Sequence, residues 1–338
     1  MRIPYRNKLL LKKLLRTLAV LIVLAAIGAV VALIYLEPRI TYDRDGAHLD
    51  APQSDVAVRA TEPRPTLENP QIVYQGEPVD AETIQEMGGY YITTEMLRDP
   101  QAVLAAVKTL DEPCAVMLEL KSIWGNFYYS TSVGGASTAS VDVTVVDELI
   151  SYLKTNGFYL IASMPAFSDS SFALANQSCG LPIRGGALWM DENGCYWLDP
   201  ANENVIAYLL QVARDLQSRG FSEVAFSHFL FPASQNIVYS SDVTTSELIS
   251  DAVGQVSSIF KGDSFSVSFV TDATDFPAEN CTGRLYITGA DGTTVERFAQ
   301  AYRGAESVKE LVFLSSSKDT RFAQQAVLRP LPGVEAEN

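Results

Sequence analysis

Runs of β-forming residues alternate with amphipathic helical segments from residue 88 onward, and this alternation constrains the fold more than any other feature. The strand-like runs are short and largely apolar, as in strands that are buried on both faces of a parallel sheet. Expected strands cover 89–94, 114–121, 158–167, 222–231, 264–271, 284–288 and 310–316. Repeated strand–helix units over about 250 residues predict an α/β protein, a (β/α)8 TIM-like barrel.

Local signals predict where the helices lie. Helices are expected over 100–110 and 141–156. Asp199 and Pro200 are expected as the N-cap and first residue of the next helix, because both residue types are favoured there. Thr244–Glu247 and Thr293–Glu296 have the spacing of capping boxes that would open two further helices.

An open, doubly wound sheet is the alternative architecture. Such a sheet usually carries a glycine-rich loop that binds a phosphate group. Gly88–Gly89 and Gly185–Gly186 lack the spacing of such loops, which favours the barrel and predicts no nucleotide cofactor.

Residues 17–36 form an uncharged apolar stretch that predicts a single transmembrane helix. Twenty helical residues span roughly the 30 Å hydrocarbon core of a bilayer. Six cations and no acid precede this stretch in residues 1–16, so the positive-inside rule predicts a cytoplasmic N-terminus and an extracellular C-terminal domain at the cell membrane. A cleaved signal peptide is the alternative, but its apolar region would be shorter.

Residues 37–86 are rich in proline and acidic residues, and they predict an extended, disordered linker. The expected organisation is therefore a basic segment at 1–16, a transmembrane helix at 17–36, the linker at 37–86, a barrel at 87–332 and a tail at 333–338.

Charge and composition exclude some functions. The formal net charge of −15 opposes binding to nucleic acid. Only two histidines occur and no two cysteines have CxxC spacing, so no metal site is expected. Cys179 and Cys195 are close enough in sequence for a disulfide in an exported domain, and the alternative is that all four cysteines are small buried apolar residues.

The segment Gly180–Pro232 resembles the core of a bacterial family of glycoside-hydrolase-like TIM-barrel proteins. The family pattern has W-x-D-P opening a helix and then G-F-D-E-I-x-F-D-Y-V-R-F-P on a strand. Here Trp197–Pro200 reads WLDP and Gly220–Pro232 reads GFSEVAFSHFLFP. Residues 88–96 (GGYYITTEM) and 117–125 (MLELKSIWG) resemble two earlier strands of the family. The resemblance implies a TIM barrel that acts on or binds glycans.

The chain departs from the family pattern at positions that matter for catalysis. Ser227 stands at the acidic position of the fourth strand and Leu230 at its arginine position. On the second strand Glu119 and Ser122 replace two aspartates, while Lys121 is retained. A serine hydroxyl cannot serve as the carboxyl acid of a glycosidase, so catalysis of the family's kind is in question.

Glu119 is the candidate catalytic residue, because it lies near the carboxyl end of a strand, where barrel enzymes place their active sites. Glu119 and Lys121 alternate with leucines and are expected to face inward together. Glycosidases need a second carboxyl group, and the positional candidates are Glu95, Asp169, Asp272, Asp275, Asp291 and Asp319. The competing interpretations are a buried ion pair for Glu119 and helix caps or solvated loops for Asp169, Asp272 and Asp319.

The candidate substrate-binding residues are Lys121, Trp124, Trp189, Trp197, Ser227 and His228, and the three tryptophans among them lie in or next to predicted loops. Tryptophan rings could stack on sugars, or Trp189 and Trp197 could contact each other across a hairpin. Ser227 and His228 are expected to point to opposite faces of a strand, which argues against a Ser-His-Asp triad.

Two functions remain open at this point, with a third less favoured. The first is a barrel that binds cell-envelope or extracellular glycan with lost or altered catalysis. The second is an active glycosidase that uses Glu119 and another carboxylate. The third is a structural or protein-binding scaffold of the envelope.

Overall fold

The computed structural model describes residues 40–43, 46–49, 87–135, 137–138, 141–261, 263–303 and 308–334. The chain divides into two compact units, 1–75 and 76–338. The second unit contains the barrel and the candidate site.

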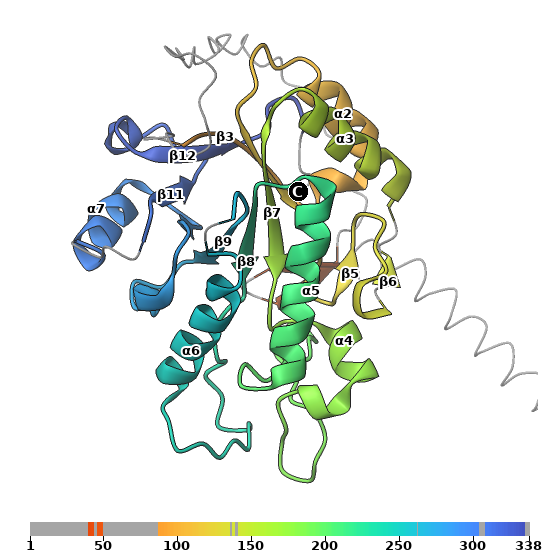
Figure 1. Cartoon of the computed structure of the whole chain (residues 1–338), viewed down its shortest axis with the longest axis vertical. Helices are drawn as coiled ribbons and strands as arrows, with labels where there is room; N and C mark the ends of the chain where they lie inside the picture. The colour runs from red at the N-terminus through yellow and green to blue at the C-terminus, as the bar shows by residue number, and fades with distance from the viewer. Residues whose placement is uncertain are drawn as a thin grey trace, which may run out of the picture. The chain divides into compact units, whose positions relative to one another are not determined.

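Parallel strands close into an eight-stranded barrel in the order β10-β11-β12-β3-β4-β7-β8-β9, which confirms the predicted barrel (Figure 1). The sequence predicted all of these strands except β12, which closes the barrel by pairing with β3. The strand bounds are β3 Gly88–Ile92, β4 Ala115–Glu119, β7 Tyr159–Pro165, β8 Glu223–Ser227, β9 Ser266–Thr271, β10 Leu285–Ile287, β11 Leu311–Leu314 and β12 Ala326–Pro330.

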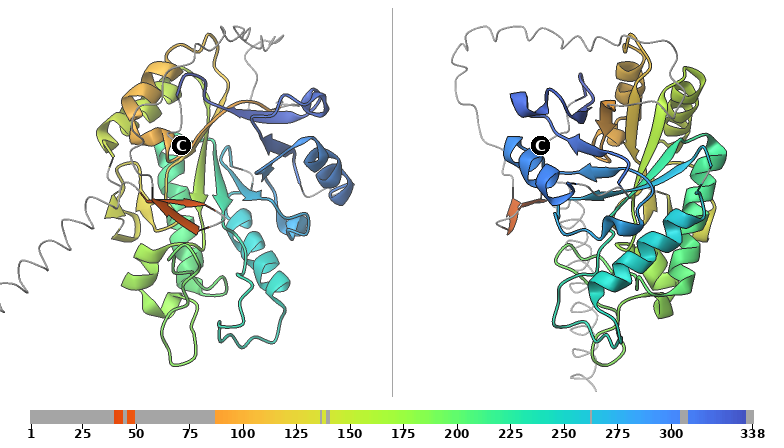
Figure 2. Two further views of the ribbon diagram at one scale, coloured as in Figure 1. Left: turned by 180° about the vertical axis from the view of Figure 1, so that it is seen from behind. Right: turned by 60° about the vertical axis from the view of Figure 1, so that its left-hand side comes forward.

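Helices pack around the outside of the strands, as the views in Figure 2 show. They are α2 Pro100–Val107, α3 Val143–Thr155, α4 Ser170–Ala175, α5 Glu203–Arg219, α6 Thr245–Ser258 and α7 Gly292–Ala301. In the described residues, short 3-10 turns stand where regular helices would follow β9 and β11, so the C-terminal third is an abbreviated version of the (β/α)8 pattern. These turns are η5 Ala278–Asn280 and η6 Thr320–Phe322, and the other small elements are η2 Met96–Arg98, η3 Val133–Gly135, η4 Gln177–Cys179, β5 Asn126–Phe127 and β6 Ser137–Thr138.

Strand β4 shows how the sequence pattern builds two hydrophobic cores. Val116 and Leu118 are buried in the layer between strands and helices. Ala115 and Met117 belong to a separate cluster inside the barrel. Because side chains alternate along a strand, Glu119 continues the inner row, which confirms its predicted inward direction.

A network of charged and phenolic side chains fills the barrel at the amino ends of its strands. Arg284 Nη1 lies 2.7 Å from Glu223 Oε2, and Arg284 Nε lies 2.9 Å from Glu310 Oε2. The hydroxyls of Tyr159 and Tyr286 donate to Glu223 at 2.9 and 3.0 Å. Since Arg284 and Glu223 are fully buried, this end is packed, and a ligand has to enter at the opposite mouth.

The predicted start of α5 at Asp199 and Pro200 was wrong. Helix α5 begins at Glu203, and Asn202 is its N-cap, because its side chain accepts from Asn204 N. The Asp199 carboxylate is used in the preceding turn, where it accepts from Ala201 N at 3.0 Å and from the Tyr239 hydroxyl at 2.9 Å.

The two predicted capping boxes had different outcomes. Thr244 and Glu247 form the box that opens α6, as predicted. The box of α7 consists of Asp291 and Thr294 rather than Thr293–Glu296, because the Asp291 carboxylate accepts from two backbone N–H groups of the first turn.

Strand β8 ends at Ser227, whereas the predicted strand continued to residue 231. His228 has φ of 51°, and it is the one non-glycine residue with positive φ in the described part of the chain. A left-handed residue breaks the extended conformation, so the strand cannot continue through it.

The N-terminal predictions are only partly covered by the structure. The predicted membrane helix at 17–36 lies outside the described residues, and no helix within the described ranges has the length and apolarity needed to cross a bilayer. Within 37–86, β1 Ile40–Asp43 pairs antiparallel with β2 Gly46–Leu49, so this part of the predicted disordered linker has secondary structure.

All four cysteines are free, so Cys179 and Cys195 do not form a disulfide. Both are buried, in agreement with the alternative that they act as small apolar residues.

Candidate functional site

The candidate site lies at the mouth of the barrel formed by the carboxyl ends of the strands. Parallel strands bring these ends together at one face, and loops of different strands then present polar side chains to a common space. The inner rows of β4 and β8 reach this mouth with Glu119 and Ser227.

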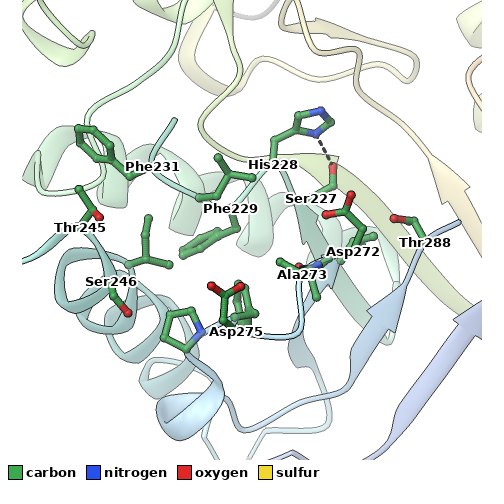
Figure 3. Close-up of a pocket in the computed structure, with 16 residues that line it drawn as sticks. Ser227, His228, Phe229, Phe231, Thr245, Ser246, Asp272, Ala273, Asp275 and Thr288 are labelled. Atoms are coloured by element: carbon green, nitrogen blue, oxygen red, sulfur yellow. Dashed lines mark hydrogen bonds between the residues drawn. The ribbon is translucent and has the colours of Figure 1, made fainter. Parts of the chain in front are cut away.

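A cavity of about 530 Å³ opens at the ends of β8, β9 and β10 and extends to the start of α6. Its polar side chains include Ser227, His228, Asp272, Asp275 and Thr288 (Figure 3). Its apolar lining includes Phe229, Phe231 and Phe276. A cavity of this size with a few polar groups on an apolar wall has the character of a small-molecule site.

Ser227 and His228 are hydrogen-bonded to each other, with 3.2 Å between Ser227 Oγ and His228 Nδ1 (Figure 3). The prediction that they point to opposite faces was therefore wrong. It assumed an extended residue 228, but the positive φ of His228 turns its ring back toward the serine.

The surroundings of His228 favour the neutral imidazole. His228 as a whole is exposed to solvent, but the protein atoms around its imidazole partly desolvate it, which lowers its pKa below the ordinary value, and the nearby Lys121 charge lowers it further. The charges of Asp191 and Asp272 act in the opposite direction. The Trp197 ring lies beside the imidazole, with 6.0 Å between the ring centroids.

Glu119 lies at the end of β4, where its Oε2 accepts a hydrogen bond from Thr94 N at 2.9 Å. Burial raises the pKa of its carboxyl above the ordinary value, and the negative charge of Glu95 adds to this effect, while the Thr94 bond opposes it. A carboxyl with a raised pKa is suited to act as a general acid. Glu119 is not among the described residues that line the cavity at β8 to β10.

Lys121 belongs to the framework of the site rather than to a ligand-binding surface. Its Nζ lies 2.7 Å from Asp169 Oδ2 and donates to Pro165 O at 2.8 Å, and both charged side chains are 1% exposed. Asp169 also accepts from the Tyr208 hydroxyl at 2.7 Å and caps α4 through Phe172 N. The buried ion pair considered for Glu119 and Lys121 is thus made by Lys121 with Asp169, and burial keeps this ammonium away from the solvent.

The three tryptophans differ in their exposure. Trp124 is 48% exposed and available to a ligand, whereas Trp197 is buried. Trp189 and Trp197 contact each other with ring centroids 6.3 Å apart, as the hairpin interpretation predicted. The Trp197 Nε1 donates to Asp191 at 2.8 Å, so this ring is fixed by the hairpin turn.

The structure separates the candidate carboxylates into groups. Asp319 caps η6, in agreement with the helix-cap interpretation, and Asp291 caps α7. Asp272 and Asp275 lie in the cavity, as their position after a strand allowed. Sequence reasoning missed Phe231 and Thr288, although Thr288 ends a predicted strand, which was an available signal.

No group of residues suited to bind a metal ion occurs in the described ranges. The candidate site presents hydroxyl, imidazole, carboxyl and aromatic groups. These can bind sugars and transfer protons.

A protein-family model described as "Putative glycosyl hydrolase domain" matches residues 89–268. No curated protein matches the chain. Three solved structures illustrate its structural similarity. A hypothetical protein from Ruminiclostridium thermocellum ATCC 27405 is 19% identical with a TM-score of 0.46, over 54% of this chain and 96% of that one.

The glycoside hydrolase domain of PelA from Pseudomonas aeruginosa is 14% identical with a TM-score of 0.43, over 74% of this chain and 96% of that one. The α-galactosidase TtGalA from Thermus thermophilus is 11% identical with a TM-score of 0.48, over 67% of this chain and 50% of that one. This chain thus spans about half of the α-galactosidase.

Proposed function

The chain belongs to the family of putative glycosyl hydrolase domains. We propose that its barrel binds a glycan at the mouth without cleaving glycosidic bonds by the family's route. The observation that carries the proposal is the cavity at the ends of β8 to β10, which contains Ser227 at the position of the family's strand acid. A serine hydroxyl can hydrogen-bond to a sugar, but it cannot protonate a leaving group as a carboxylic acid does.

The chemistry of the cavity supports a sugar ligand. Phenylalanine rings offer apolar faces, and the hydroxyl and carboxylate groups of Ser227, Thr288 and Asp272 offer hydrogen-bonding groups around them. Trp124 is an additional exposed aromatic face on the loop after β4, suited to a longer chain that extends beyond the cavity.

The apolar stretch at 17–36 bears on where in the cell the proposed glycan binding takes place. We propose that it anchors the chain in the cell membrane and holds the barrel on the extracellular side, where cell-envelope or extracellular glycans are the available ligands. Fractionation of cells that produce the chain, with protease added outside intact cells, tests this. If the barrel in intact cells is protected from the added protease, the proposed extracellular location is contradicted.

Glycan binding is tested with the full-length chain in detergent on an array of envelope and extracellular oligosaccharides. A glycan that binds is then titrated into Asp272→Asn and Trp124→Ala variants. We expect each to weaken binding about tenfold, which corresponds to about 1.4 kcal/mol. Ile259→Ala is the control, because Ile259 is an exposed apolar residue at the other end of α6. Equal affinity in all variants, or no bound glycan, would contradict the proposal.

A second function, glycoside hydrolysis by Glu119, is favoured by the raised pKa of that carboxyl. Its partner would be Glu95, whose charge acts on Glu119 and whose carboxylate lies 3.0 Å from Arg98 Nε. Release of new reducing ends by the wild type and its loss in Glu119→Gln would establish this function in place of the first.

A further inference from the structure

The fourth-strand motif contains two adjacent departures from the family pattern, and the structure brings them together. Where the family has D-Y, this chain has Ser227 and His228. Their side chains form a hydrogen bond of 3.2 Å between Oγ and Nδ1. A serine hydroxyl in contact with an imidazole is the basic unit of nucleophilic catalysis at an acyl group.

The backbone at this point is held in an unfavourable conformation. His228 has a Cβ atom and yet adopts φ of 51°, and such residues concentrate at functional sites because the surroundings must impose them. The surroundings are well defined here. Ser227 O accepts from Ala166 N at 2.8 Å. The next residue, Phe229, packs against Phe167 and Phe269 with ring centroids 4.5 and 4.8 Å away.

Ser227 and His228 both line the cavity, and a carboxylate lies beside Ser227. Asp272 follows β9 and lies next to Ser227 in Figure 3. Its charge and that of Asp191 act on the imidazole against the charge of Lys121. The imidazole is nevertheless biased toward its neutral form, which is the form that can accept a proton.

We propose that Ser227 and His228 form a nucleophile and general base that hydrolyse ester bonds of O-acylated sugars. The choice of a sugar ester rests on the proposed glycan-binding function, whereas the ester chemistry rests on the pair itself. Asp272 is assigned as a positioning residue that stabilises the imidazolium.

The reaction has two balanced steps. Ser227 Oγ bonds to the ester carbonyl carbon while its proton passes to His228 Nδ1, and the sugar hydroxyl leaves with that proton. In the second step, water bonds to the acyl carbon and gives a proton to His228 Nδ1. The bond between the acyl carbon and Ser227 Oγ then breaks, Oγ takes this proton, and the free carboxylic acid is released. Water is the one co-reactant, and no oxidant or reductant is needed.

The cavity has room for both parts of such an ester. The cavity has a volume of about 530 Å³ and extends from the Ser227–His228 pair to Thr245 and Ser246 at the start of α6 (Figure 3). Phe231 and Phe276 give it an apolar wall. The sugar ring can therefore occupy the cavity while its acyl group reaches the serine.

The test uses the full-length chain in detergent with 4-nitrophenyl acetate and β-D-glucose pentaacetate, measuring nitrophenol and acetate. We expect hydrolysis by the wild type and a loss of about a hundredfold or more in Ser227→Ala and His228→Gln, because general base catalysis contributes about 10²–10⁴-fold. The exposed Ser218→Ala on α5 is the matched control and should retain the wild-type rate. Asp272→Asn should lower the rate less than His228→Gln and shift the pH profile.

Covalent labelling keeps the test decisive if a variant folds poorly. A fluorophosphonate probe should label Ser227 of the wild type, identified by peptide mass spectrometry, and should label the His228→Gln variant more slowly. Wild-type hydrolysis no faster than that of the variants, or a label on another serine, would overturn the proposal.

The outcomes also separate this proposal from glycan binding. If the wild type hydrolyses the esters but binds no glycan, the catalytic role of Ser227 and His228 stands and the glycan-binding function is refuted. If the wild type binds a glycan but hydrolyses neither ester, the glycan-binding function stands and the catalytic role of the pair is refuted.

Discussion

Replacing Lys121 with methionine should destabilise the barrel strongly, because it leaves a buried carboxylate without its cation. Lys121 Nζ and Asp169 Oδ2 are 2.7 Å apart, and each side chain is 1% exposed. Removing one partner of a buried pair costs about 3–5 kcal/mol. Pro165 O also loses its donor, although the Phe172 N–H and Tyr208 hydroxyl still stabilise Asp169.

We therefore expect Lys121→Met to lower the free energy of unfolding by about 4 kcal/mol, a large fraction of the 5–15 kcal/mol typical of a domain. The assay is urea unfolding at pH 7 of residues 76–338, which contain every barrel strand. Tryptophan fluorescence reports the transition.

Two comparisons make this result specific to burial. Arg98→Met removes an exposed pair with Glu95 and should cost at most about 1 kcal/mol. Lys121→Met combined with Asp169→Leu should recover part of the loss, because no charge is then left buried. A cost below about 1 kcal/mol for Lys121→Met alone would show that the buried pair with Asp169 contributes little to stability, and Lys121 would again be a candidate ligand-binding residue.

Three further predictions concern Ser227, His228 and Glu119. Ser227→Asp restores the family's acid. We expect this variant to lose ester hydrolysis and to release reducing ends from a bound glycan. If no reducing ends are gained, other departures from the family pattern also prevent cleavage. His228→Gly relieves the left-handed backbone and should raise the free energy of unfolding by roughly 0.5–1 kcal/mol while ester hydrolysis is lost; a destabilised variant would contradict strain at this residue. Because the folded pKa of Glu119 is raised, stability is lost as pH rises from about 4 through that pKa, so Glu119→Gln should be more stable than the wild type at pH 7 but not at pH 4. Each pKa unit by which the folded protein raises the Glu119 pKa corresponds to about 1.4 kcal/mol of stability. Urea unfolding at pH 4 and pH 7 measures the difference between variant and wild type, and an equal difference at the two pH values would contradict a raised pKa of Glu119.

The barrel could be predicted from the sequence because its strands and helices carry strong local patterns. Strand β12 was missed because its short run ends in Arg329 and Pro330, which do not look like a buried strand. The start of α5 was misplaced because Asp199 and Pro200 carry a favourable helix-start signal, while the structure uses Asn202.

The candidate site was harder to predict because its main features depend on distant or unusual contacts. Lys121 and Asp169 are 48 positions apart, and nothing in either segment identifies the other as its partner. The contact between Ser227 and His228 requires a left-handed histidine, a conformation that local propensity disfavours and that packing around Phe229 imposes.

Whether the barrel binds a glycan without cleaving it is tested by measuring the reducing ends released from a glycan that the full-length chain binds. We predict saturable binding, weakened by Asp272→Asn, with no reducing ends above the level of the uncatalysed control. Release of reducing ends by the wild type, abolished in Glu119→Gln, would instead show that the protein is an active glycosidase.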